Sequence, residues 1–212
     1  LRNMTEAGVD RPMIESAILA RRGARRVLPF RYLAAARACP ALTDVLDRAL
    51  AGAISEMPVL PGRTVVLVDV SGSMDVALSA RSDLIRVDAA AALASLVRGD
   101  VRVLTFSNHL AAVEPRPVGL RGVEAIRRSQ PHQGTNLGAA IDSLPTDADR
   151  VIVITDEQAH DHVSPPPAVE RAYLINVASA QHGVGYGPRW VHLDGFSEQV
   201  LRFVHEFENA VG

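Results

Sequence analysis

The fold is decided by an apolar stretch that ends in an acid and two hydroxyls, TVVLVDVSGSMD at residues 64–75. Its first residues stay apolar and are rich in β-branched side chains, which predicts a strand buried on both faces of a sheet. Asp69, Ser71 and Ser73 follow at every second position, and Gly72 eases the turn. Three oxygen donors therefore gather at the carboxyl end of a central strand, where open α/β sheets place their ligands.

Downstream of this stretch, apolar strand patterns alternate with helical ones. We expect further strands at residues 101–106, 110–113, 151–154, 171–177 and 190–193, and helices at residues 81–98, 123–129, 137–144 and 196–210. This alternation predicts an α/β fold with a mostly parallel, doubly wound sheet flanked by helices.

Residues 1–60 have a different pattern. Apolar residues at helical spacing predict helices at residues 13–20, 32–37 and 42–57, with Thr43 or Asp44 as a cap of the third. Pro58 and Pro61-Gly62 are expected to break the chain before the strand. The sequence thus predicts two parts, a helical segment at 1–60 and an α/β domain at 61–212.

The oxygen donors after the first strand suit a hard cation such as Mg²⁺, which prefers carboxylate, hydroxyl and water oxygens. The alternative from these residues alone is an ordinary Ser/Gly loop. The spacing Asp69-x-Ser71-x-Ser73 resembles the metal-ion-dependent adhesion site of von Willebrand factor type A domains. That pattern continues with a threonine on a later loop and an acid after a later strand, and Thr135 and Asp156 stand at those places.

This resemblance implies a Rossmann-like A-domain that binds Mg²⁺, or another divalent cation, through Asp69, Ser71, Ser73, Thr135 and Asp156. Three of these ligands are neutral hydroxyls, so the cation would stay electrophilic and keep a coordination position for a carboxylate of a protein partner. That is an adhesion mechanism without a chemical reaction, and we expect no enzymatic activity.

Three shorter stretches narrow the resemblance: LRNMT at residues 1–5, RVLPF at residues 26–30 and DGF at residues 194–196. Together with the metal motif they resemble the carboxyl-terminal part of Ro autoantigen proteins, the TROVE-module family, including the bacterial Ro-related type. The family resemblance implies a ring of helical repeats that binds small noncoding RNAs of the Y type and takes part in RNA quality control. Residues 1–60 would be the last helices of that module, and most of the RNA-binding surface would lie upstream of them.

Charge and cysteine usage limit the other roles of the chain. The 212 residues carry a net charge of −2, so the overall charge of the chain does not favour binding to nucleic acid. One basic cluster could contact phosphates or could be a solvated loop, namely Arg21, Arg22, Arg25 and Arg26. The single cysteine fits a reducing, cytoplasmic compartment, and no apolar run approaches the length of a membrane span.

Two alternative functions stay open. The chain could be a free-standing adhesion or scaffold A-domain without an RNA role. It could also be a metal-dependent hydrolase with Asp75, Asp156 and Glu157 as candidate groups, although neither a paired catalytic set nor a GxxxxGK[ST] phosphate loop is visible. The pair His160 and His162 could bind a transition metal, but without further ligands it is more typical of a solvated loop.

Overall fold

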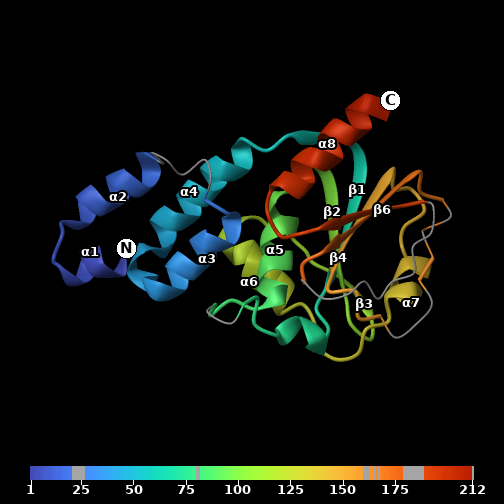
Figure 1. The fold of residues 1–212 in the computed structure, drawn as a ribbon, viewed down its shortest axis with the longest axis horizontal. Coiled ribbons are helices and arrows are strands. Elements are labelled where there is room, and N and C mark those ends of the chain that lie inside the picture. Colours follow the sequence, from blue (N-terminus) through green and yellow to red (C-terminus); the bar gives the residue numbers. More distant parts are fainter. Residues whose placement is uncertain are drawn as a thin grey trace.

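The computed structural model describes residues 1–20, 27–79, 82–159, 163, 164, 166, 168–178 and 189–211. Within these residues, one sheet of six strands runs in the order β3-β2-β1-β4-β5-β6 (Figure 1). The strands are β1 (Val59–Asp69), β2 (Arg98–Phe106), β3 (Leu110–Ala112), β4 (Arg150–Thr155), β5 (Arg171–Asn176) and β6 (Trp190–Asp194). Every neighbouring pair is parallel except β2 and β3, so the predicted mostly parallel α/β sheet is confirmed.

The central strand β1 is buried on both faces, as its continuous apolar run predicts. Residues 64–69 are all buried, and β1 pairs with β2 on one side and with β4 on the other. The expected break at Pro61-Gly62 is wrong, because both residues lie inside β1. The pairing with β2 shifts register between Leu60 and Arg63, and Gly62 has a φ of 75°, so the strand passes the proline through a local irregularity.

Helices cover both faces of the sheet. They are α5 (Arg86–Leu96), α6 (Gly119–Arg127), α7 (Leu137–Asp142) and α8 (Gln199–Val211), with a short 3₁₀ turn η3 at Gly72–Asp75. Val66 and Val68 of β1 belong to the larger core, which includes side chains of α5, α6 and α8, whereas Val65 and Leu67 belong to a smaller core with α7. The sheet is therefore doubly wound.

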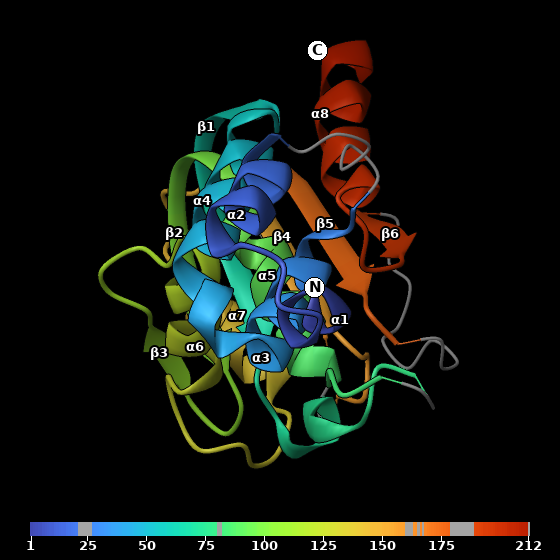
Figure 2. The ribbon, with the colours of Figure 1, turned by 90° about the vertical axis from the view of Figure 1, so that its left-hand side faces the viewer.

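The described residues before β1 form helices that stack beside the sheet domain, with α3 next to α5 and α4 next to α6 (Figures 1 and 2). They are α1 (Arg2–Glu6), α2 (Arg11–Ala20), α3 (Pro29–Ala38) and α4 (Thr43–Ser55), with a 3₁₀ turn η2 at Pro40–Leu42. The expected cap at the start of α4 is wrong. Leu42 occupies the N-cap position without a side-chain hydrogen bond, and the Thr43 hydroxyl donates to the carbonyl of Pro40 at 2.8 Å.

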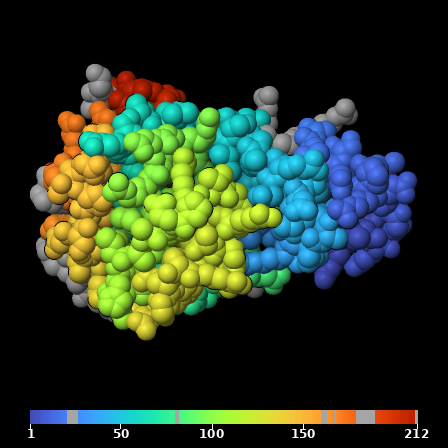
Figure 3. Space-filling view, turned by 180° about the vertical axis from the view of Figure 1, so that it is seen from behind, coloured from blue at the N-terminus to red at the C-terminus, as the bar shows by residue number. Residues whose placement is uncertain are grey.

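Burial in this segment increases towards the sheet. No residue of α1 is buried and α2 buries only Ile14, whereas α3 and α4 contribute nine buried positions between them. The buried side chains of α3 and α4 belong to the same core as α5 and β1. In the space-filling view the first helices form one end of the molecule (Figure 3).

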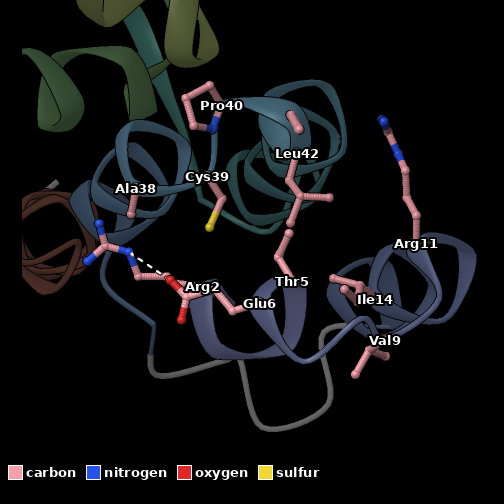
Figure 4. A pocket seen from close by; sticks show the side chains of 11 residues that line it. Arg2, Thr5, Glu6, Val9, Arg11, Ile14, Ala38, Cys39, Pro40 and Leu42 are labelled. Carbon is pink, nitrogen blue, oxygen red and sulfur yellow. Dashed lines mark ion pairs between the residues drawn. The ribbon is translucent and has the colours of Figure 1, made fainter.

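A cavity of about 330 Å³ lies among α1, α2, the end of α3 and η2 (Figure 4). Its wall includes the apolar side chains of Ile14 and Leu42, and Cys39 contributes a buried thiol. Arg2 and Glu6 form an exposed ion pair at its edge, with 3.7 Å between nitrogen and oxygen. Because α1 closes one side of this cavity without burying a residue of its own, α1 is the least firmly packed of the four helices.

Candidate metal centre

The predicted ligands lie at the carboxyl ends of β1 and β4. Asp69 is the last residue of β1, and Asp156 directly follows β4. After β1 the chain adds β2 and β3 on one side of it and β4 on the other, so the strand order reverses between β1 and β4. Ligand sites of open α/β sheets form at such a reversal, outside the carboxyl ends of the strands.

Asp69 is fully buried and held by two hydrogen bonds. Its Oδ1 accepts from the backbone N–H of Ser71 at 2.8 Å, and its Oδ2 accepts from the Thr155 hydroxyl at 2.6 Å. The first of these bonds tightens the turn after β1, and the second joins β1 to β4. The carboxylate therefore has a fixed orientation that does not depend on a bound cation.

A chain of hydrogen bonds connects the next three predicted ligands. The hydroxyl oxygens of Ser71 and Ser73 lie 3.1 Å apart, and the Ser73 hydroxyl donates to Oδ1 of Asp156 at 3.2 Å. Ser71 and Asp156 are both fully buried, and Ser73 is partly exposed. The structure thus brings Asp69, Ser71, Ser73 and Asp156 together.

The fifth predicted ligand, Thr135, lies on the adjoining loop between α6 and α7 and is buried. The backbone N–H of Gly72 donates to the carbonyl of Gln133 at 2.8 Å, which holds this loop against the turn that carries the two serines. His132 reinforces the contact, because one ring nitrogen lies 2.7 Å from Oδ1 of Asp75 and the other 2.8 Å from the carbonyl of Arg127. Asp75, a candidate catalytic group by sequence, therefore takes part in a contact between loops.

Burial of two carboxylates in one place has an electrostatic cost. The pKa of Asp69 is raised from 3.8 to about 6, mainly by burial and to a smaller extent by the negative charge of Asp156, against the hydrogen bonds from Ser71 and Thr155, which lower it. Asp156 is compensated by Arg86, whose Nη1 donates to its Oδ2 at 2.7 Å. A buried carboxylate with a raised pKa and several hard oxygen donors beside it fit a divalent cation, which would supply the missing positive charge.

The donor set also limits the kind of metal. Among the described residues, there is no group of three or more His, Cys, Asp or Glu side chains that could hold a metal ion. The candidate centre instead combines two carboxylates with three hydroxyls. Zinc and similar metals favour cysteine and histidine ligands, which the candidate centre lacks among the described residues. Mg²⁺ binds a few carboxylates and completes its coordination shell with water.

Two contacts at the centre were not predicted. Thr155 is not among the predicted ligands, yet its hydroxyl donates to Asp69 and accepts a hydrogen bond from the backbone N–H of Glu157 at 3.0 Å. Arg86 was expected inside a helix, and it is in fact the first residue of α5, facing Asp156. A hydroxyl residue directly before Asp156 is a local signal for Thr155, whereas no local pattern marks Arg86.

Glu157, the third candidate catalytic residue, is buried and has a left-handed backbone with a φ of 62°. Its carboxylate contacts Nε2 of His192 on β6. A non-glycine residue with positive φ is uncommon and concentrates at sites where the surrounding structure enforces it. The residue after Asp156 is therefore held in place by its own buried contact.

Some of the sequence-based candidates lie outside the described residues. They are the basic cluster Arg21, Arg22, Arg25 and Arg26, and the pair His160 and His162. Among the residues that the structure does describe, none of the helices combines the length and the apolar character that crossing a bilayer requires.

Comparison with known proteins gives similarity in structure but not in sequence. No family model matches the chain, and no curated protein matches it significantly. The crystal structure of the Ro (RSR) protein of Deinococcus radiodurans is similar with a TM-score of 0.64 and 20% identity, covering 92% of this chain and 48% of that one. An aerotolerance-related membrane protein from Bacteroides fragilis gives a TM-score of 0.38 at 20% identity, covering 54% of this chain and 67% of that one.

The similarity to the Deinococcus protein extends over nearly all of this chain, so it includes both the helical segment and the α/β sheet. At 20% identity it shows a shared fold. This chain spans about half the length of the Ro protein that it matches. The chain therefore has an α/β fold of the von Willebrand factor A type, preceded by helices, in an arrangement that a Ro protein shares.

Proposed function

We propose that this chain is part of a Ro-like protein, and that its α/β domain binds Mg²⁺ and docks a protein partner through a carboxylate of that partner. The observation that carries the proposal is the hydrogen-bonded group of Asp69, Ser71, Ser73 and Asp156 at the point where the strand order reverses. Thr135, on the loop held against the same turn, completes the proposed ligand set.

The proposed ligands have separate roles. The hydroxyls of Ser71, Ser73 and Thr135 are neutral oxygen donors, and Asp69 and Asp156 supply charge directly or through bound water. Bound Mg²⁺ would offer an electrophilic coordination position to an incoming carboxylate. The chain's own residues would orient that cation, and Thr155 and the backbone of Ser71 would fix the carboxylate of Asp69.

Metal titration of the purified protein tests the centre. A ligand that binds only the folded state stabilises it by RT ln(1 + [L]/Kd), about 2.7 kcal/mol at a hundredfold excess over Kd, so Mg²⁺ should raise the melting temperature. Asp69→Asn should abolish this rise. Asp147→Asn is the matched control, since Asp147 is an exposed acid that pairs with Arg63 and its replacement changes the net charge equally. Equal Mg²⁺ affinity in wild type and Asp69→Asn would contradict the proposal.

A docking role requires no turnover. We therefore expect no Mg²⁺-dependent hydrolysis of a model phosphodiester such as bis(p-nitrophenyl) phosphate. Hydrolysis that disappears in Asp69→Asn but persists in Asp147→Asn would favour the alternative of a metal-dependent hydrolase.

The RNA part of the proposal is supported by the shared fold with the Ro protein and by the local basic cluster at residues 21–26. We expect this chain to bind RNA weakly and without sequence preference, because four arginines offer few phosphate contacts in a chain of net charge −2. Filter binding at two salt concentrations checks this. Replacing the four arginines by glutamine should abolish most of the binding, whereas Asp69→Asn should leave it nearly unchanged.

A further inference from the structure

An arginine is placed inside the candidate metal centre. Arg86 begins α5, and its Nη1 lies 2.7 Å from Oδ2 of Asp156 and 3.4 Å from the backbone carbonyl of Ser73. The Asp156 side chain is fully buried, and only 17% of the Arg86 side chain is exposed. The Arg86 guanidinium therefore contacts Asp156, one of the proposed metal ligands, and is largely shielded from water.

The contact with Arg86 engages the carboxylate of Asp156, which is also a proposed ligand of the cation. Oδ2 of Asp156 accepts from Arg86, while Oδ1 accepts from the Ser73 hydroxyl at 3.2 Å and from the backbone N–H of Gln158 at 3.3 Å. A guanidinium has five N–H donors, no acceptor and a permanent charge, so it cannot itself coordinate a metal. A cation that approaches Asp156 meets both a competing donor and a like charge.

The groups around Arg86 favour its contact with Asp156. The nearest acid on its own helix, Asp88, accepts two hydrogen bonds from Arg37 of α3, at 2.7 and 2.6 Å, and one from the backbone N–H of Ile85 at 3.0 Å. The backbone N–H of Arg86 donates to the carbonyl of Val76 at 3.0 Å, which fixes the start of the helix. With Asp88 engaged elsewhere, Asp156 is the acid that Arg86 pairs with among the described residues.

We propose that Arg86 is a built-in counter-ion of Asp156 that competes with the divalent cation and so sets the affinity of the metal centre. This inference rests on the proposed function, because it assumes that Asp69 and Asp156 bind a cation. Two carboxylates and one guanidinium leave a formal charge of −1 without the metal, and a bound Mg²⁺ reverses it to +1. Two carboxylates and Mg²⁺ are neutral together once Arg86 leaves Asp156, so on this proposal metal binding releases the Arg86 side chain.

Calorimetric titration of the whole chain with Mg²⁺ tests this competition. Arg86→Gln removes the charge and should bind Mg²⁺ about ten- to a hundredfold more tightly than wild type, since a charge-assisted hydrogen bond in such a site is worth roughly one to two decades in affinity. Arg63→Gln is the matched control. Arg63 lies near the start of β1, roughly 20 Å along the strand from Asp69, and should leave the affinity unchanged.

Thermal unfolding separates competition from a purely structural role. In EDTA, Arg86→Gln should melt below wild type, because two buried carboxylates lose their counter-ion. At saturating Mg²⁺ the difference should close or reverse. A residue that only stabilised the fold would lower the melting temperature equally in both conditions.

A measurement on the wild type covers the case in which Arg86→Gln fails to fold. The ¹⁵N resonances of the Arg86 guanidinium, assigned by their loss in Arg86→Lys, should show restricted rotation in EDTA and freer rotation in Mg²⁺. Unchanged guanidinium dynamics on Mg²⁺ binding, or equal or weaker Mg²⁺ affinity in Arg86→Gln, would overturn the role of Arg86 and leave the metal centre standing. No Mg²⁺ binding by wild type or variant would overturn the metal centre and this inference together.

Discussion

Arg37 at the end of α3 donates two hydrogen bonds to Asp88 in the first turn of α5, at 2.7 and 2.6 Å. The Asp88 side chain is fully buried, and it also accepts the backbone N–H of Ile85. The hydrogen bonds that Arg37 donates to Asp88 raise the pKa of Arg37, although burial opposes this effect. The pair is therefore a bidentate link between the helical segment and the sheet domain, two residues along α5 from Arg86.

The first prediction concerns this link. Arg37→Ala leaves a buried carboxylate with no charged partner, which we expect to lower the free energy of unfolding by about 2–4 kcal/mol. Arg2→Ala is the control, because Arg2 and Glu6 form an exposed pair worth at most about 0.5 kcal/mol. Urea denaturation followed by circular dichroism measures both. Equal stability of the two variants would show that the link contributes nothing.

The second prediction concerns the helical segment as a whole. The backbone N–H of Leu120 in α6 donates to Asp47 of α4 at 2.8 Å, and Arg98 donates to the carbonyl of Met57 at 2.6 Å. Since α3 and α4 also share a core with α5, a chain that begins at Val59 should lose stability and bind a dye for apolar surfaces such as ANS. A chain that begins at Gly8 lacks only α1, which buries no residue, and should behave like wild type.

A truncated chain from Val59 that is as soluble and as stable as wild type would mean that residues 1–58 are a linker. Dye binding by the chain from Gly8 would instead mean that α1 covers more apolar surface than its burial indicates.

The sequence predicted those parts of the centre that depend on local spacing. A continuous apolar run marked β1, and the alternation of Asp69, Ser71 and Ser73 follows from the chain alone. Thr155 depends on the register of two strands, because the pairing of Val68 with Ile154 sets the next residues, Asp69 and Thr155, side by side. That register is a property of the folded sheet.

Arg86 shows a different limit of the sequence. Residues 81–98 have a helical apolar pattern throughout, but the helix begins at Arg86. Ile85 instead pairs with Ala77 in an isolated antiparallel bridge, which ends the preceding loop and fixes the start of α5. A contact between segments therefore decides which arginine faces Asp156, and periodicity within one segment carries no information about it.

The third prediction concerns the raised pKa of Asp69 in the metal-free protein. The folded state binds this proton more readily than the unfolded chain does, so the contribution of Asp69 to stability is complete below about pH 4 and is lost as the pH rises through about 6. In EDTA, wild type should therefore lose about 2.5 kcal/mol relative to Asp69→Asn between pH 4 and pH 7.5. Urea denaturation of both proteins across this range measures the difference, in which other titrating groups cancel. A difference that stays flat with pH would show that burial does not raise this pKa.

The fourth prediction concerns Thr155 as a positioning residue. Thr155→Val removes the hydroxyl that donates to Asp69 at 2.6 Å and accepts from Glu157 at 3.0 Å. It should cost about 1–3 kcal/mol of stability, because a buried carboxylate oxygen is left without its donor. It should also weaken Mg²⁺ binding, since the orientation of Asp69 is no longer fixed. Thr155→Ser restores the hydroxyl and should recover the affinity, a rescue that a loss of packing alone would not produce.

The last prediction concerns the buried ion pair that attaches α8 to the sheet. Arg150, at the start of β4, donates from Nε to Oε1 of Glu208 at 2.5 Å and from Nη1 to the Thr64 hydroxyl at 2.8 Å. The Tyr173 hydroxyl also donates to Oε1 of Glu208, at 2.9 Å. Burial alone would raise the pKa of Glu208, but the hydrogen bonds from Arg150 and Tyr173 outweigh it and hold the pKa below its ordinary value. Glu208 is therefore charged and fully engaged.

Glu208→Ala leaves the buried guanidinium of Arg150 without its charged partner and should lower the free energy of unfolding by about 3–5 kcal/mol. Glu206→Ala, two residues away on the same helix and largely exposed, should change it by no more than about 0.5 kcal/mol. Urea denaturation followed by circular dichroism measures each variant, and the fluorescence of the single tryptophan, Trp190 on β6, reports the smaller core on the other face of the sheet. Replacing both partners, as Arg150→Met with Glu208→Leu, should recover much of the loss, because no unpaired charge then stays buried. A cost of Glu208→Ala no larger than that of Glu206→Ala would show that α8 is held by its apolar face alone.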